Sequence, residues 1–160
     1  MAPVTRWLTD DEQRAWRAFA LATRLLTDRL DRDLLAAADM PPTYYELLVL
    51  LSEAPERTMR MSELASWTNS KPSRISHAIN KLEQKAWVRR EHCADDRRGW
   101  LAVLTDDGFA ALQAAAPRHV VSVREHLIDL LTPEQLRNLE DISRVLLDHL
   151  TEPGPSSPSR

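Results

Sequence analysis

The fold is decided by the stretch from Met61 to Thr105, which reads MSELASWTNSKPSRISHAINKLEQKAWVRREHCADDRRGWLAVLT. It contains a short helical pattern, a break, a second helical pattern, and two strand-like runs joined by a charged turn. This order predicts a helix, a turn, a second helix and a two-stranded β-wing.

The second helix is expected over residues 72–85, because Pro72 has no N–H to leave unpaired and therefore suits a first helical turn. Apolar residues recur there at spacings of three and four and form one stripe that must be buried. These are Ile75, Ala78, Ile79, Leu82 and Ala86.

The opposite face of this helix is polar and basic, with no carboxylate before Glu83. It carries Ser73, Arg74, His77, Asn80, Lys81 and Gln84. Such side chains donate hydrogen bonds to phosphates and base edges, and the major groove is wide enough to admit a helix. A plain surface helix normally mixes its charges, so this face favours an anionic partner.

The wing is predicted from two short runs rich in strand-favouring residues, Trp87–Glu91 and Trp100–Leu104. Arg97 and Arg98 lie at the charged tip between them, where they can reach a phosphate or the narrow minor groove. Asp96 beside them can hold a guanidinium in place.

From Arg60 through Gly108 the chain resembles the winged helix-turn-helix of the multiple antibiotic resistance regulator (MarR) family of bacterial transcription factors. The matching pieces are MSELA, PSRISHAINKLEQKAWVRRE and DDRRGWLAVLTDDG. In them, Asp96, Arg98, Leu104, Thr105 and Gly108 fall on the family's wing pattern. Two departures lie at the turn. Thr68, Asn69 and Ser70 replace a glycine flanked by apolar residues, although Asn tolerates the left-handed conformation, and Lys71 stands where a small capping residue is usual.

The resemblance implies a mainly α fold, an α+β winged helix, with a dimerisation domain built from both ends of the chain. The expected parts are an N-terminal dimerisation helix (10–38), a winged helix-turn-helix DNA-binding domain (43–104, with recognition helix 72–85 and wing 87–104), C-terminal dimerisation helices (105–150) and a disordered tail (151–160).

Three pairs of residues, each a threonine followed three positions later by Glu or Gln, form capping boxes that predict the starts of helices. These are Thr9 with Glu12, Thr43 with Glu46, and Thr132 with Gln135. Thr105 is placed to cap a further helix, and Pro117 should kink that helix without ending it. Residues 54–60 are expected to form a loop.

The predicted function is a ligand-responsive repressor that binds an inverted-repeat operator as a homodimer, since surplus apolar helix surface is most simply buried against a second copy. Two recognition helices would then lie about one DNA turn apart, ~34 Å. The expected DNA-binding residues are Lys71, Ser73, Arg74, Ser76, His77, Asn80, Lys81, Asp96, Arg97 and Arg98. The alternative is an effector-independent DNA-architectural or protein-interaction module.

The resemblance also implies a cleft for a small aromatic or anionic effector between the dimerisation helices and the DNA-binding domain. Trp16, Phe19, Tyr44 and Tyr45 are aromatic residues near that position, and tyrosine hydroxyls can orient a phenol or a carboxylate. The alternative is that all four belong to the core, as aromatic residues at helical spacing usually do.

Composition narrows the remaining possibilities. The net charge is −3 over 160 residues, but residues 60–104 hold nine Lys and Arg against five Asp and Glu, so the basic charge coincides with the motif. No apolar run resembles a signal peptide or a membrane span, so a cytoplasmic protein is expected. Cys93, the single cysteine, is expected to be an exposed, inert thiol.

Metal and enzyme chemistry have little support in the sequence. His119 and His126 share a helix face, but two histidines without nearby cysteines are weak support for zinc. No P-loop, GxGxxG, GxSxG or HExxH pattern is present, so we expect no enzyme activity and no cofactor.

Overall fold

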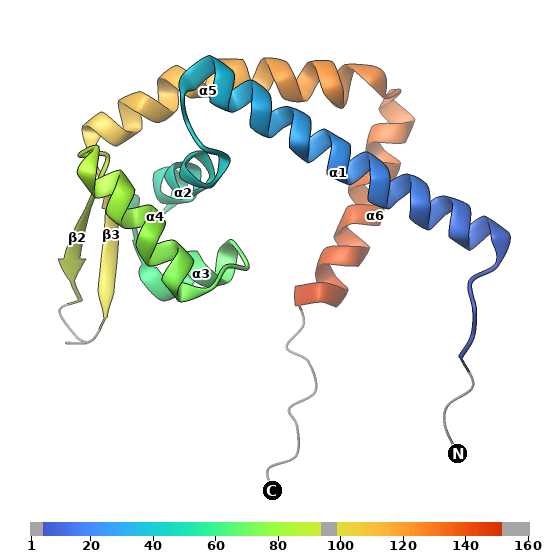
Figure 1. Cartoon of the computed structure of the whole chain (residues 1–160), viewed down its shortest axis with the longest axis horizontal. Helices are drawn as coiled ribbons and strands as arrows, with labels where there is room; N and C mark the ends of the chain where they lie inside the picture. The colour runs from blue at the N-terminus through green and yellow to red at the C-terminus, as the bar shows by residue number, and fades with distance from the viewer. Residues whose placement is uncertain (1–4, 94–98, 152–160) are drawn as a thin grey trace, which may run out of the picture. The chain divides into compact units, whose positions relative to one another are not determined.

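The computed structural model describes residues 5–93 and 99–151. Within them the elements are α1 (Asp10–Ala38), α2 (Pro42–Glu53), η1 (Pro55–Arg57), β1 (Thr58–Arg60), α3 (Met61–Trp67), α4 (Pro72–Gln84), β2 (Val88–His92), β3 (Trp100–Leu104), α5 (Asp106–His126), η2 (Ile128–Leu130) and α6 (Pro133–Thr151) (Figure 1). The chain divides into two compact units, residues 1–122 and 123–160, and each is described by itself. The mainly α fold with a helix-turn-helix and a β-wing is confirmed.

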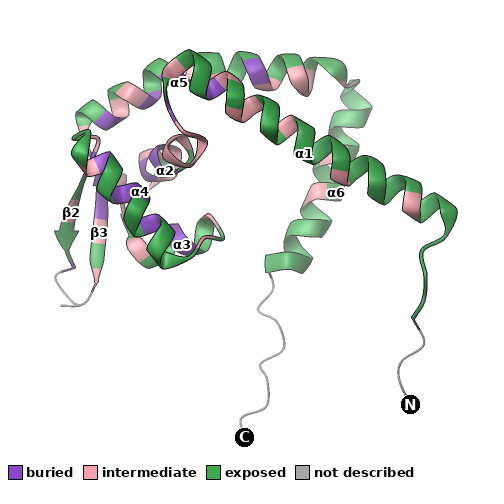
Figure 2. Ribbon diagram, viewed as in Figure 1, coloured by how far each residue is buried: buried purple, intermediate pink, exposed green. Residues whose placement is uncertain are grey.

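The core of the first unit lies where α2, α3 and α4 meet the sheet. The apolar stripe of α4 is fully buried at Ile75, Ile79 and Leu82. Leu47 and Leu51 of α2, which is apolar on nearly every side, lie in the same cluster. Figure 2 shows this buried face of α4 in purple beside its exposed green face. Because the stripe is buried, the opposite face of α4 must point outward.

The sheet is antiparallel with strand order β1-β3-β2, and Ala102 at its centre pairs with Met59 on one side and Arg90 on the other. The expected loop over residues 54–60 is therefore wrong at its end, because Thr58–Arg60 forms β1. Three residues are too few to show alternation in the sequence, and pairing with β3 is what makes them a strand. The first wing strand, β2, begins one residue later than expected and ends at His92.

Two of the three predicted capping boxes form. The N–H of Glu12 donates to Thr9 Oγ1 and that of Gln135 to Thr132 Oγ1, with the reciprocal bonds also present. The box at Thr43 is wrong, because α2 begins earlier, at Pro42, and has no side-chain cap. Proline is favoured at the first helical position, so the helix can begin at Pro42 without a side-chain cap.

The recognition helix starts at Pro72, as expected, and ends at Gln84. Ala86 does not belong to its buried stripe, because it is exposed and has a left-handed backbone with φ of 59°. The N–H of Trp87 then donates to Leu82 O, which closes the helix end before β2 begins.

The start of α5 is tied to this same turn. Thr105 Oγ1 donates to Ala86 O and accepts the N–H of Gly108, which confirms Thr105 as the cap. Gly108 is buried against Trp87, and α5 continues past Pro117 to His126. A side chain at position 108 has no room, because a Cβ there would lie 2.0 Å from Trp87 O.

We therefore expect Gly108→Ala to lower the free energy of unfolding by about 1–3 kcal/mol, since backbone must move to admit the methyl group. Urea unfolding followed by circular dichroism measures the change. Ala110→Ser, at an exposed position of the same helix, is the control and should stay within about 0.5 kcal/mol of the wild type. An equal effect of the two substitutions would show that the close contact with Trp87 does not exist.

Candidate nucleic-acid interface

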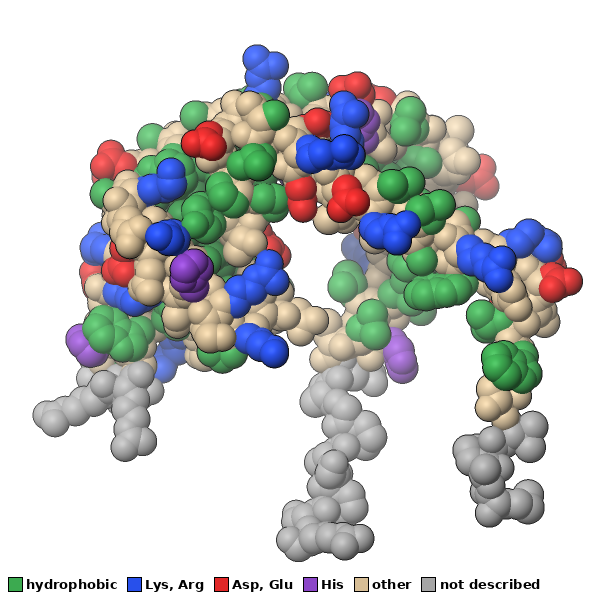
Figure 3. All heavy atoms as spheres, in the orientation of Figure 1, with side chains coloured by type: hydrophobic (Ala, Val, Ile, Leu, Met, Phe, Trp, Pro, Cys, Tyr) green, Lys and Arg blue, Asp and Glu red, His purple; other side chains and the backbone are tan. Residues whose placement is uncertain are grey.

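The outward face of α4 carries the side chains that the sequence assigns to DNA. Ser73, Arg74, Ser76, His77, Asn80 and Lys81 are all exposed. Figure 3 shows Lys, Arg and His side chains gathered over this part of the molecule. No acidic residue lies in the first turn of α4, and Lys81 Nζ donates to Gln84 Oε1 on the same helix at 3.3 Å. The face is therefore cationic and open to a partner.

The turn before α4 forms as expected from its asparagine. Asn69 is left-handed with φ of 45°, and the N–H of Ser70 donates to Ala65 O at 2.9 Å. Beside it lies a hollow of about 520 Å³ lined by Asn69, Ser70, Lys71, Ser73, Arg74 and His77. Lys71 is the N-cap and supplies no side-chain cap. Pro72 has no N–H and the N–H of Arg74 donates to Lys71 O at 2.9 Å, so among the described first-turn residues the N–H of Ser73 is left for a partner. A phosphate suits such a helix start.

The wing tip lies outside the described residues, and with it the expected contacts Asp96, Arg97 and Arg98. The base of the wing is closed by the N–H of Cys93, which donates to Gly99 O at 3.0 Å. Cys93 is buried, so the expectation of an exposed thiol is wrong. His92 and Trp100, which pair across the two strands, stack with their ring centroids 3.8 Å apart.

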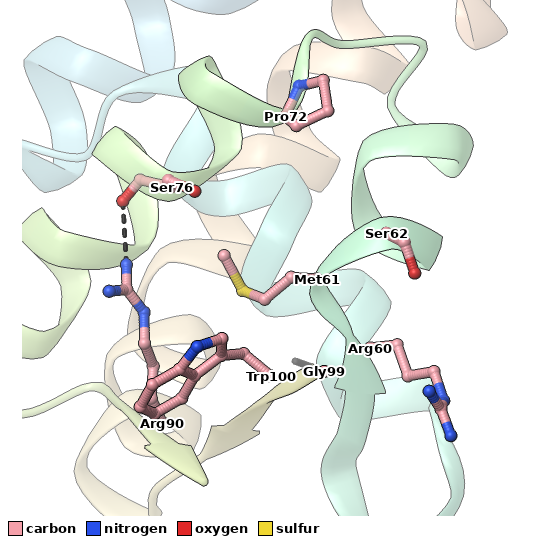
Figure 4. A pocket seen from close by; sticks show the side chains of 8 residues that line it. All are labelled: Arg60, Met61, Ser62, Pro72, Ser76, Arg90, Gly99 and Trp100. Atoms are coloured by element: carbon pink, nitrogen blue, oxygen red, sulfur yellow. Dashed lines mark hydrogen bonds between the residues drawn. The ribbon is translucent and has the colours of Figure 1, made fainter. Parts of the chain in front are cut away.

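Arg90 connects the recognition helix to the wing, a role that the sequence did not indicate. From β2, its Nη2 donates to Ser76 O of α4 at 2.9 Å, and its Nε lies 3.4 Å from the Glu83 carboxylate. The backbone N–H of Arg90 donates to the same carboxylate at 3.1 Å. Figure 4 shows the bond to Ser76 at the wall of a hollow of about 460 Å³ between α3, α4 and the wing.

These bonds explain why α4 carries an acidic residue, Glu83, near its carboxyl end. Glu83 faces β2 and not a DNA partner, and it is half-buried together with Arg90. The position of Glu83 at the end of the acid-free face was visible in the sequence, but its partner on another element was not. The pair fixes α4 relative to the wing strands, so the recognition helix and the wing keep a constant relative position.

A third hollow, a cavity of about 370 Å³, lies between α1, α2 and α5. Of the four aromatic residues expected at an effector cleft, Tyr45 lines this cavity. Trp16 and Phe19 are exposed on α1, and Tyr44 packs against the core. Asp31, Glu46 and His119 also line the cavity, and their proximity arises from the packing of three helices, which no local pattern indicates.

His119 and His126 both lie on α5. Within residues 5–93 and 99–151, no group of three His, Cys, Asp or Glu side chains is arranged to hold a metal ion. His119 instead stacks on Tyr45, with ring centroids 4.6 Å apart. In the same described part of the chain, no helix is long and apolar enough to cross a membrane.

A three-stranded sheet, a helix-turn-helix and an outward cationic recognition helix define a winged helix-turn-helix protein. The MarR family model matches residues 40–99. Sco3205, a MarR family transcriptional regulator from Streptomyces coelicolor with a crystal structure in complex with DNA, is 48% identical with a TM-score of 0.88, and the match covers 96% of this chain and 94% of that one. The chain belongs to the MarR family of transcriptional regulators.

Two further relatives agree. AbsC, also a MarR family transcriptional regulator from Streptomyces coelicolor, is 48% identical with a TM-score of 0.85, and the match covers 91% of this chain and 98% of AbsC. The transcriptional repressor MprA of Escherichia coli (strain K12) is 26% identical over 133 residues, which are 82% of this chain and 73% of MprA.

The Arg90–Glu83 pair can be tested by a double-mutant cycle on unfolding free energy. We expect a coupling of about 1 kcal/mol from Arg90→Ala, Glu83→Ala and the double substitution, because both side chains are largely shielded from water. The exposed pair Arg144–Glu140 on α6 is the matched control and should give below about 0.5 kcal/mol. A coupling no larger than that of the control would contradict a role in holding α4 to the wing.

Proposed function

We propose that the protein is a DNA-binding transcriptional repressor. The observation that carries this proposal is the exposed basic face of α4, free of acidic residues through three turns and backed by a fully buried apolar stripe. Arg74, His77 and Ser73 are assigned to base edges, where arginine and polar side chains read the major groove. Lys71 and Lys81 are assigned to phosphates, and Arg98 to the minor groove with Asp96 holding it.

We propose further that the protein acts as a homodimer. In α6 no residue is buried, although one face carries Leu136, Ile142, Val145, Leu146 and Leu150. In α1, Leu34 is the one buried residue, and Trp16 is 59% exposed. Apolar surface of this extent is normally covered by a partner. A two-fold dimer provides that cover and presents two recognition helices to an inverted repeat.

An effector that binds between α1, α2 and α5 would complete a ligand-responsive regulator. The cavity of about 370 Å³ is within the range of small-molecule sites and has mostly apolar walls. The proposal places the protein in the cytoplasm with its DNA and assigns it no catalytic step. The alternative, an effector-independent architectural or adaptor protein, differs in the selectivity with which it binds DNA.

Selectivity for DNA is therefore the first test. The protein should prefer a fragment that it selects from its own genome over random duplex by ~10³ or more in a competition assay, whereas an architectural protein would barely discriminate. An adaptor without DNA affinity would show no salt-dependent binding to any duplex.

Single substitutions divide the α4 contacts by role. Arg74→Ala should weaken binding to the selected fragment by about 1–3 kcal/mol and relax its sequence preference. Lys81→Ala should weaken binding to all duplexes and reduce the salt slope by about one. Arg17→Ala, an exposed arginine of α1, is the control for loss of one positive charge and should change neither quantity. If Arg17→Ala weakened DNA binding as much as Arg74→Ala, α4 would not be the recognition helix.

The dimer is tested by sedimentation equilibrium, which should give twice the 18.3 kDa mass of one chain. Ile142→Lys, which places a charge on the apolar face of α6, should shift the mass toward that of one chain. Asn138→Asp, at an exposed polar position of the same helix, should leave it unchanged. If the wild-type protein sedimented as a single chain at all concentrations, the proposal of a homodimer would be wrong.

A further inference from the structure

The cavity between α1, α2 and α5 has an unusual combination of walls. Its aliphatic lining comes from Leu30 and Leu34 of α1 and from Pro42, Val49 and Leu50 of α2. Its polar lining is acidic or uncharged, being Asp31, Glu46, Tyr45 and His119. Among the described residues that line it, none is a lysine or an arginine. The lining is thus apolar with net negative charge.

Glu46 lines the cavity from α2 and remains in contact with solvent, while part of its surface is buried. Burial raises the pKa of its carboxyl above the usual value, and the Arg74 guanidinium only partly opposes that rise. An ionised carboxylate at an apolar wall is stabilised when a positive charge comes beside it. A ligand that brings a cation into the cavity would supply this charge, and an anionic ligand would be repelled.

His119 lies in a setting that disfavours a positive charge on its ring. Burial lowers the pKa of its imidazole below the usual value, against the opposing effect of Asp31. Its Nδ1 is buried and has no hydrogen-bond partner within the described structure. The ring stacks on Tyr45, so an aromatic face also lies in the wall. Aromatic faces attract cations.

We propose that this cavity selects a small organic cation, with its ammonium group beside Asp31 and Glu46 and its apolar body against the aliphatic wall. This inference rests on the proposed effector site and replaces an anionic effector with a cationic one. Because Glu46 also interacts electrostatically with Arg74 of the recognition helix, a bound cation changes the field at a proposed DNA contact. Ligand and DNA affinities are then linked reciprocally.

Calorimetric titration of the 160-residue chain in an amine-free phosphate buffer tests the selectivity. The probes are three molecules of similar size: 2-phenylethylammonium, the uncharged 2-phenylethanol and the anionic phenylacetate. We expect the cation to bind about tenfold or more tightly than the alcohol, and the anion to bind most weakly. Equal affinities, tighter binding of the anion, or no binding of the cation at millimolar concentration would overturn the proposal.

Variants locate the site. Glu46→Gln should weaken the cation by about tenfold and leave the alcohol unchanged, because only the charge is removed. Asp31→Asn is a second variant on another helix with the same expected result. Glu53→Gln, an exposed acid at the end of α2, is the control and should change neither affinity. Unchanged cation binding in both Glu46→Gln and Asp31→Asn would place the cation elsewhere and refute the site.

DNA binding of the same preparations without probes separates the two proposals. If the protein binds DNA but shows no selectivity for the cation, only the proposal of a cation site is wrong. Absence of DNA binding in the wild type removes the proposed function, and the titrations still report on the cavity.

Discussion

Burial of one stripe of α4 is the constraint on which the rest of the structure depends. With Ile75, Ile79 and Leu82 fully enclosed, rotation of the helix about its axis would expose apolar surface, at a cost of about 25 cal/mol for each Å². The orientation of Arg74 and His77 therefore follows from packing on the other side of the same helix. Burial of the apolar stripe is therefore sufficient to orient the cationic face toward solvent.

Much of the fold follows from local patterns in the sequence. The Thr9 and Thr132 capping boxes, the asparagine turn and the proline start of α4 each require only neighbouring residues, so each could be predicted. The three-residue strand β1 and the early start of α2 could not. Strand β1 exists because β3 pairs with it, and a pairing between residues about forty positions apart leaves no local signal.

The candidate site divides in the same way. The exposed residues of α4 lie on one helix and could be assigned by spacing alone. The Arg90–Glu83 pair and the cavity containing Asp31, Glu46 and His119 join different elements, and their chemistry depends on distances that only the fold creates. Burial also altered individual expectations, since Cys93 is enclosed and Tyr45 alone of four aromatic residues reaches the cavity.

The junction at Thr105 has a mechanical consequence. Its hydroxyl and its N–H are bonded to Ala86 O and Trp87 O, while Gly108 allows α5 to lie directly on Trp87. The first turn of α5 is thus joined to the residues that link α4 to β2. A displacement of this first turn would therefore move the residues that join the recognition helix to the wing.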